Sequence, residues 1–272
     1  MASRIWLIVL LTGALWLNPT WSSAALASTS KSGIQQTLRA AVAANFREPF
    51  VTLSERYLKL SGDAVLGVFG SSGMLSAQIQ QGAPFDLFFS ADSQRPHDLV
   101  TSGHAAGEPF TYARGRLALW MPEGMPGGPG RRTPGLPPSL ETGVAGRFAL
   151  ANPALAPYGR AARECLQSMK LWEQASERAV YGNSISQTYH FIASRGVQAG
   201  FIAFSQAVAQ NLPNSELWLV PSTCHLPIDQ QVVGLRSAKP EAVARFLEFV
   251  ASAEAQSIIG ALGYDHLPGE SP

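Results

Sequence analysis

Short apolar runs alternate with longer stretches of helical spacing along most of this 272-residue chain. A short apolar run bounded by turn residues is typical of a buried strand, and apolar residues that recur every three to four positions indicate a helix. Alternation of the two predicts α/β layers with largely parallel sheets. The predicted strands are 38–44, 64–69, 85–90, 116–121, 147–151, 179–182, 200–204, 217–220 and 230–235, and the predicted helices are 46–60, 74–81, 159–171, 184–194 and parts of 240–262.

Two such strand–helix series, separated by connecting strands, predict a bilobal architecture with a hinge. We expect residues 28–114 and 226–272 to form lobe 1, because the last strand and helices can return to the first series. Residues 115–225 are expected to form lobe 2, with the Pro/Gly-rich run 122–138 as an exposed loop. A single doubly wound domain is the plain alternative.

Residues 1–27 have the pattern of an export signal. Arg4 supplies a short positive region, 5–17 form an apolar core, and Ala25-Leu26-Ala27 is a small-residue cleavage site. The apolar core is too short to span a membrane. We therefore expect cleavage near Ala27 and a periplasmic protein, with an uncleaved anchor helix as the alternative.

The net charge narrows the classes of partner, and the cysteine content leaves two states of the thiols open. Without Arg4 the formal charge falls from +1 to about zero, and the chain has no basic run. This argues against nucleic acid and anionic membrane surfaces as partners. The cysteines Cys165 and Cys224 could form a disulfide in an oxidising compartment or stay unpaired and buried, and the sequence leaves both open.

Four predicted strand ends lead into a helix through a turn that offers hydrogen-bond donors. In open α/β sheets, ligands bind beyond the carboxyl ends of the strands, and the first N–H groups of a helix can bind an anion. Each turn adds a neutral hydroxyl or amide but little charge, so the four together predict a cage for a fully ionised oxyanion. The turns are Ala43–Phe46, Gly70–Gly73, Asn152–Gly159 and Gly182–Ser186.

A family resemblance rests on five segments, namely Val42–Phe46, Phe69–Gly73, Gly82–Asp92, Ala151–Gly159 and Asn183–Thr188. In this order and spacing they resemble the molybdate-binding proteins of ABC transporters, over nearly the whole mature chain. The resemblance implies the type II periplasmic-binding-protein fold, with the oxyanion between two α/β lobes. It also implies that a monomer without cofactor or enzymatic activity captures molybdate or tungstate and delivers it to an ABC permease in the inner membrane.

The resemblance also assigns roles to individual residues. It implies that Asn45 offers its side chain or backbone to the anion and that Ser72 offers its hydroxyl and N–H. Tyr158 and Ile185 would offer backbone N–H groups from lobe 2, and Ala44 is a further N–H donor. Some members of the family add a tyrosine hydroxyl where this chain has Ala203, which removes one ligand hydrogen bond. Molybdenum would be held only as the oxyanion, with no direct protein–metal bond.

Two other functions fit parts of the sequence. The same cage could receive sulfate, phosphate or another oxyanion. A secreted serine hydrolase would use Ser71 or Ser72, but a nucleophile elbow needs Gly-x-Ser-x-Gly, and Gly70–Gly73 is one residue too short. Asp86 and Asp92 would repel an oxyanion, so we expect structural roles for them. No metal-ligand spacing occurs among the histidines His97, His104, His190, His225 and His266.

Overall fold

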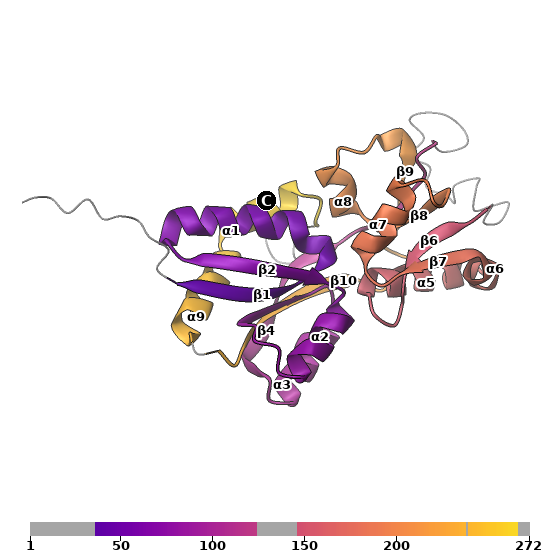
Figure 1. The fold of residues 1–272 in the computed structure, drawn as a ribbon. Coiled ribbons are helices and arrows are strands. Elements are labelled where there is room, and N and C mark those ends of the chain that lie inside the picture. The colour runs from indigo at the N-terminus through magenta and orange to yellow at the C-terminus, as the bar shows by residue number, and fades with distance from the viewer. Residues whose placement is uncertain (1–35, 124–145, 238, 266–272) are drawn as a thin grey trace, which may run out of the picture. The chain divides into compact units, whose positions relative to one another are not determined.

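The computed structural model of the chain describes residues 36–123, 146–237 and 239–265. The predicted export signal and most of the Pro/Gly-rich run therefore lie outside the described residues. Two five-stranded sheets organise the described part (Figure 1). The predicted α/β class is confirmed, and the alternative of one doubly wound sheet is wrong.

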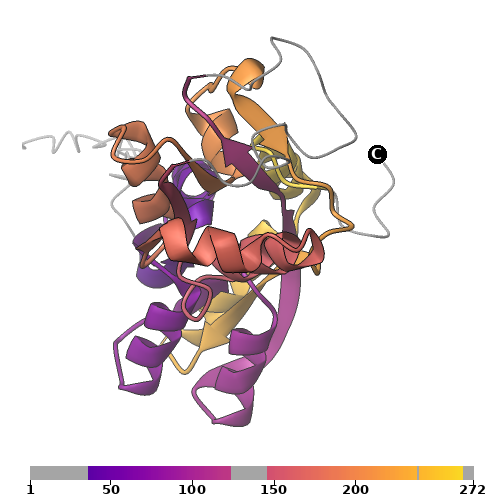
Figure 2. The same cartoon turned by 90° about the vertical axis from the view of Figure 1, so that its right-hand side faces the viewer.

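The first sheet has the strand order β2-β1-β3-β10-β4. Strand β1 pairs in parallel with β2 and β3, and β10 runs antiparallel between β3 and β4. Helices α1, α9 and α10 pack on one face, and α2 and α3 lie side by side on the other (Figures 1 and 2). The strands are β1 (Thr37–Ala43), β2 (Ala64–Gly70), β3 (Leu87–Ser90), β4 (Ala105–Gly115) and β10 (Ile228–Leu235), and the helices are α1 (Arg47–Ser61), α2 (Ser72–Gln80), α3 (Gln94–Thr101), α9 (Pro240–Val250) and α10 (Ala253–Ala261).

The second sheet repeats this plan with the strand order β7-β6-β8-β5-β9. Here β6 pairs in parallel with β7 and β8, and β5 is the antiparallel strand between β8 and β9. Helices α5 and α6 pack on one face, and α7 and α8 pack on the other. The strands are β5 (Leu117–Trp120), β6 (Phe148–Ala151), β7 (Ala179–Gly182), β8 (Ala199–Ala203) and β9 (Leu217–Leu219), and the helices are α5 (Pro157–Ser168), α6 (Trp172–Arg178), α7 (Ile185–Ala193) and α8 (Phe204–Ala209).

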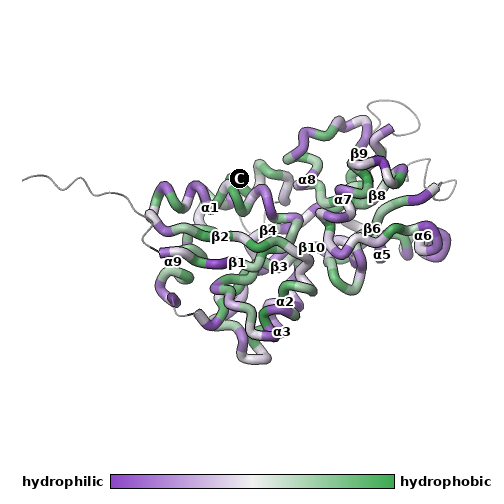
Figure 3. Tube along the Cα trace, in the orientation of Figure 1, coloured by the Kyte–Doolittle hydropathy of each residue, from purple (hydrophilic) through white to green (hydrophobic). Residues whose placement is uncertain are grey.

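Burial on both faces explains why residues 40–43 of β1 are all apolar. In β1, Ala40 and Val42 belong to the core under α1, while Ala41 belongs to the core under α2 and α3. Successive side chains of a strand point to opposite faces, so apolar residues are favoured at successive positions where a strand is covered on both sides. The tube in Figure 3 shows the contrast between hydrophobic β6 and β8 and the hydrophilic helix α6.

The chain passes between the sheets twice. Only Arg116 separates β4 from β5, and the return passage runs from Leu219 to Ile228. At the first crossing, Arg114 of β4 lies opposite Asp229 of β10, and its Nε and Nη2 donate to the two carboxylate oxygens at 2.6 and 3.2 Å. A disulfide joins Cys165 of α5 to Cys224 in the return passage, which decides between the two cysteine states that the sequence left open.

Several predicted boundaries need correction. The sequence prediction missed α3, β4 and α8, partly because β4 is half exposed, contains Pro109 and pairs with β10 through register shifts. Phe204 begins α8 and does not end the preceding strand. The predicted helix 159–171 corresponds to α5, which ends at Ser168, and Lys170 beyond it adopts a left-handed φ of 61°. The sequence prediction also missed α6, which begins at Trp172.

The helices were also compared with the length and apolar character of a membrane-spanning helix. None of those within 36–123, 146–237 and 239–265 combines the length and the apolar character needed to cross a membrane.

Candidate functional site

The four predicted donor turns meet at one small pocket. They follow the carboxyl ends of β1, β2, β6 and β7, and Ala91 after β3 joins them. In each sheet the pocket lies beyond the strand with a parallel neighbour on either side, which is where open α/β sheets bind ligands. All five residues predicted for the site are among the lining residues, which are Ala43, Ala44, Asn45, Gly70, Ser71, Ser72, Ala91, Ala156, Pro157, Tyr158 and Ile185.

Backbone N–H groups are the main polar feature of these turns. Ser72 is the first residue of α2, Ile185 is the first of α7, and Tyr158 follows Pro157 at the start of α5. Ala44 and Asn45 open a short 3-10 helix, Ala44–Phe46. An N–H at such a position has no acceptor inside its own helix, and the helix dipole adds partial positive charge there. The turns therefore present donors from both sheets.

The pocket is small and carries no formal charge. No Asp, Glu, Lys, Arg or His occurs among its lining residues in the described part of the chain. Its volume is about 10 Å³, counted as the space open to the centre of a water-sized sphere. One water molecule needs about this much space. The lining of the pocket thus suits a small group that accepts hydrogen bonds.

The two adjacent serines have different tasks. Ser71 is the N-cap of α2, and its hydroxyl oxygen accepts from the Met74 N–H at 3.4 Å. Ser72 Oγ accepts from the Ala91 N–H at 2.9 Å, so its own proton is available to a group in the pocket. The interaction with Ala91 holds the β2 and β3 turns together and orients the Ser72 hydroxyl.

The side chain of Asn45 is engaged within the protein. Asn45 lies inside the 3-10 helix, and Phe46 is the N-cap of α1. Its side-chain Nδ2 donates to Gln230 Oε1 at 2.8 Å and to the Tyr264 hydroxyl at 3.0 Å. Both amide protons are therefore engaged within the protein, which leaves the backbone N–H of Asn45 as the group that can serve an anion.

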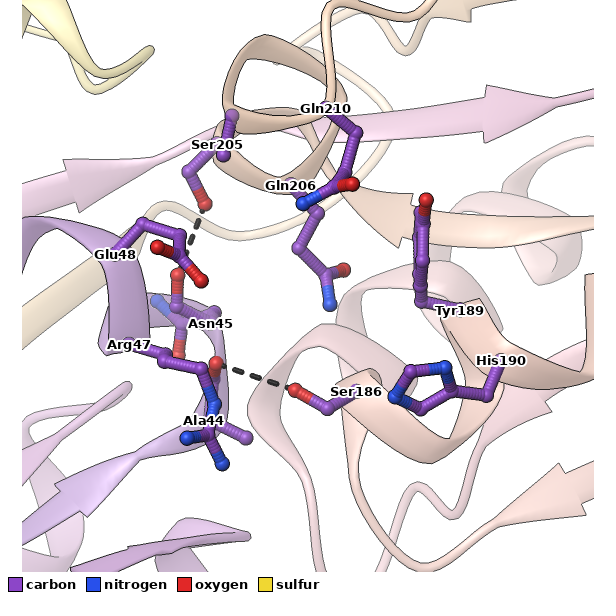
Figure 4. A pocket seen from close by; sticks show the side chains of 11 residues that line it. Ala44, Asn45, Arg47, Glu48, Ser186, Tyr189, His190, Ser205, Gln206 and Gln210 are labelled. Atoms are coloured by element: carbon purple, nitrogen blue, oxygen red, sulfur yellow. Dashed lines mark hydrogen bonds between the residues drawn. The ribbon is translucent and has the colours of Figure 1, made fainter. Parts of the chain in front are cut away.

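The backbone of this turn is held from the second sheet. Figure 4 shows Ser186 of α7 and Ser205 of α8 pointing at two successive carbonyl oxygens. Ser186 donates to Ala44 O at 3.3 Å and Ser205 donates to Asn45 O at 3.0 Å. Because a trans peptide points its C=O and N–H in opposite directions, the bond to Ala44 O turns the Asn45 N–H away from Ser186. These serines line a second pocket, of about 200 Å³, which shares Ala44 and Asn45 with the small one.

A buried hydrogen-bond network lies beside the pocket. Gln230 Oε1 accepts from Asn45 and from the Tyr112 hydroxyl at 3.0 Å, and its Nε2 donates to the Tyr158 hydroxyl at 3.1 Å. The Tyr264 hydroxyl donates to Asn45 O at 2.9 Å. Burial raises the pKa of Tyr112, Tyr158 and Tyr264 above the ordinary value of 10.0. The network is therefore neutral at physiological pH.

The sequence analysis missed Gln230, Tyr112 and Tyr264. The sequence held one indication of a buried Gln230. It alternates with its neighbours so that its side chain shares the inward face of the strand with Ile228 and Val232. A polar residue at an inward position of an alternating strand indicates a buried hydrogen-bond partner.

The remaining sequence candidates lie outside the small pocket. Ala203 packs into the apolar core and has no exposed surface. Asp86 accepts from the Arg39 N–H at 2.7 Å, and Asp92 accepts from the Ser90 hydroxyl at 2.9 Å and pairs with Arg95. These contacts fit the structural roles expected for the two carboxylates. Among the described residues, no three His, Cys, Asp or Glu side chains are grouped as metal ligands would be.

The tyrosine network predicts how stability changes with pH. The unfolded chain loses phenolic protons near pH 10, whereas the folded chain keeps those of Tyr112, Tyr158 and Tyr264. The free energy of unfolding should be independent of these groups below about pH 10 and fall above it, by about 1.4 kcal/mol per pH unit for each tyrosine. Urea unfolding across this range measures the slope, and Tyr112→Phe should make it shallower. A free energy that rises with pH in this range would contradict the prediction.

Comparison with known proteins agrees with this architecture. The family described as "Bacterial extracellular solute-binding protein" matches residues 38–265. The molybdate-binding protein ModA of Rhodobacter capsulatus is 39% identical over 227 residues, which are 83% of this chain and 86% of that protein. ModA of Azotobacter vinelandii is 35% identical over 234 residues, which are 84% of this chain and 89% of that protein.

Solved structures give the same fold. The periplasmic molybdate-binding protein of Azotobacter vinelandii superposes with a TM-score of 0.76 at 34% identity, covering 85% of this chain and 99% of that one. The sulfate-binding protein SubI of Mycobacterium tuberculosis H37Rv superposes with a TM-score of 0.66 at 12% identity, covering 86% and 88%. The second likeness concerns the fold alone. The predicted bilobal periplasmic-binding-protein fold is confirmed.

Proposed function

Because the chain belongs to the bacterial extracellular solute-binding proteins, we propose that it captures molybdate, and tungstate as well, and delivers the oxyanion to an ABC permease. The observation that carries this proposal is the small neutral pocket at which helix N-termini from both sheets meet. Hydrogen bonds to an ionised group contribute about 1.5–3 kcal/mol each. Several such bonds offset the cost of association without any charged side chain.

The proposed ligand contacts follow the positions of the donors. Ser72 contributes its hydroxyl and N–H, and Ala44, Asn45, Tyr158 and Ile185 contribute backbone N–H groups. A pocket that offers only donors favours an anion without a proton, because a protonated oxygen finds no acceptor there. Molybdate is such an anion at neutral pH. The identity of the ligand is supported further by the two molybdate-binding relatives above 30% identity.

Capture is proposed to be a hinge motion of two lobes. Lobe 1 is residues 28–114 and 226–272 and lobe 2 is residues 115–225, so both crossings of the chain lie at the boundary. Each lobe supplies part of the anion's hydrogen bonds, and the ligand therefore favours the arrangement in which the lobes meet. The permease then recognises the closed form.

The cellular setting completes the proposal. Residues 1–27 direct export and are removed near Ala27, and the mature chain acts in the periplasm as a monomeric receptor. Its permease partner lies in the inner membrane. The protein binds and releases its ligand unchanged, without a cofactor and without catalysis.

Isothermal titration calorimetry tests this function. Molybdate should bind the wild-type protein with a measurable heat and raise its melting temperature, because a ligand that binds only the folded state stabilises it. Sulfate and phosphate serve as competing oxyanions in the same experiment. Heat with sulfate or phosphate but none with molybdate would replace the proposed ligand by another oxyanion.

Ser72→Ala tests the site itself. We expect molybdate affinity to fall about tenfold, which corresponds to the loss of one hydrogen bond to a charged group. Ser54→Ala is the matched control, because Ser54 lies outside the lining of the small pocket and its hydroxyl donates to Phe50 O within α1, so molybdate affinity should stay close to wild type. Equal molybdate affinities of wild type and Ser72→Ala would remove Ser72 from the site.

A further inference from the structure

We propose that Gln230 is a positioning residue of the anion site, which holds the turn that carries Asn45 against the helix that carries Tyr158. This inference rests on the proposed molybdate binding. Gln230 is fully buried in β10 and is absent from the lining of the small pocket. Its effect on the ligand therefore passes through its neighbours.

The amide of Gln230 bridges the two sheets. Its Oε1 accepts from Asn45 Nδ2 at 2.8 Å, in the turn after β1 of the first sheet. Its Nε2 donates to the Tyr158 hydroxyl at 3.1 Å, in α5 on the second sheet. Asn45 and Tyr158 also line the small pocket, and both are proposed to offer backbone N–H groups to the anion. One buried side chain thus sets the distance between donors from the two sheets.

The partners leave little freedom in the choice of side chain. Position 230 must accept from Asn45 and Tyr112 and also donate to Tyr158. Glutamate at this position has no N–H donor and places a carboxylate in a fully buried site, and methionine of similar length has neither polar group. A buried polar atom that loses its partner costs free energy, so its neighbours would shift to find new partners.

Gly115 preserves the room that this arrangement needs. A Cβ at Gly115 would collide with the Tyr158 hydroxyl and come within 2.7 Å of Gln230 Nε2. Gly115 is the last residue of β4, directly before the first crossing. The Tyr158 hydroxyl and the Gln230 amide are therefore packed against the strand that connects the sheets.

Loss of this bridge should affect binding more than folding. Hydrogen bonds weaken steeply when the donor points away from its acceptor, so small shifts of the Asn45 and Tyr158 backbones reduce several ligand contacts together.

Gln231 provides a matched control. It is the next residue of the same strand, and its Nε2 donates to Thr111 Oγ1 at 3.3 Å. It is half-buried and stands on the opposite face of β10, away from Asn45 and Tyr158. Gln231→Met therefore makes the same chemical change next to the network without touching it.

The experiment compares wild type, Gln230→Met and Gln231→Met by molybdate calorimetry and by thermal unfolding with and without molybdate. Gln230→Met should raise the Kd at least about tenfold and reduce the ligand-induced rise in melting temperature, while Gln231→Met stays within about twofold of wild type. A merely structural role of Gln230 would lower the melting temperatures of the free and loaded forms equally and leave the Kd unchanged.

Tyr158→Phe keeps the inference testable should Gln230→Met fail to fold. It removes only the hydroxyl at the far end of the bridge, keeps the backbone N–H, and should raise the Kd in the same direction. If the wild type binds molybdate and the folded Gln230→Met and Tyr158→Phe variants bind it with the same Kd, the proposed role of Gln230 is wrong, while the proposed function stands. No binding of molybdate by the wild type overturns the proposed function and this inference together.

Discussion

Ile185→Pro should weaken molybdate binding by about 10- to 150-fold, because it removes one N–H donor to a charged ligand, worth about 1.5–3 kcal/mol. Proline is compatible with the first position of a helix, where the N–H has no acceptor within the helix. Ser184 before it is extended, with φ −146° and ψ 164°, as a residue that precedes proline should be. Pro157 already occupies the equivalent position of α5. The helix should therefore form while the donor is lost.

Ile185→Val is the matched control for this substitution. It keeps the N–H and shortens the buried side chain by one carbon, so it measures the effect of packing alone. Calorimetry with molybdate compares the two variants, and circular dichroism checks that α7 is retained. If Ile185→Pro binds molybdate as tightly as Ile185→Val does, the Ile185 N–H is not a ligand donor.

Removal of the disulfide should have the largest effect on stability. Cys165 and Cys224 are 59 residues apart in sequence, and closing a loop of that length stabilises a fold by about 4 kcal/mol in the chain-entropy account. The bond ties α5 to the return passage between β9 and β10. Unfolding of the Cys165→Ala/Cys224→Ala variant should therefore occur at a markedly lower urea concentration, and the melting temperature should fall by about 8–16 °C.

Reduction of the wild-type protein provides an independent check. A thiol reductant should lower the stability of the wild type and leave that of the double variant unchanged. Molybdate affinity of the folded double variant should stay close to wild type, because neither cysteine lines the small pocket. Equal urea midpoints for the oxidised and reduced wild type would contradict the prediction.

Local patterns in the sequence were sufficient to predict the donor turns. Residues 70–73 and 182–186 each contain a glycine at the end of a strand and a serine before or at the start of a helix. Such signals concern neighbours in sequence, and the geometry of a helix start depends on few residues. The predicted positions at these turns therefore agree with the structure to within a residue or two.

The network around Gln230 depended on contacts between distant parts of the chain. Gln230 is 185 residues from Asn45, 118 from Tyr112 and 72 from Tyr158. No local pattern records such distances, and a glutamine in a strand has many possible partners. The engaged side chain of Asn45 was unpredictable for the same reason, since its partners come from β10 and from the C-terminal Tyr264.

The sequence by itself determined the α/β class, the order of most strands and helices, and the turns that can offer donors to an anion. Tertiary structure alone decided that each sheet holds one antiparallel strand between two others, that Cys165 pairs with Cys224, and that Asn45 uses its side chain within the protein. The physical reason is the separation in sequence between the residues that interact. Helix starts and strand alternation are set by neighbouring residues, whereas pairing of strands, cysteines and buried polar groups depends on which distant segments the fold brings together.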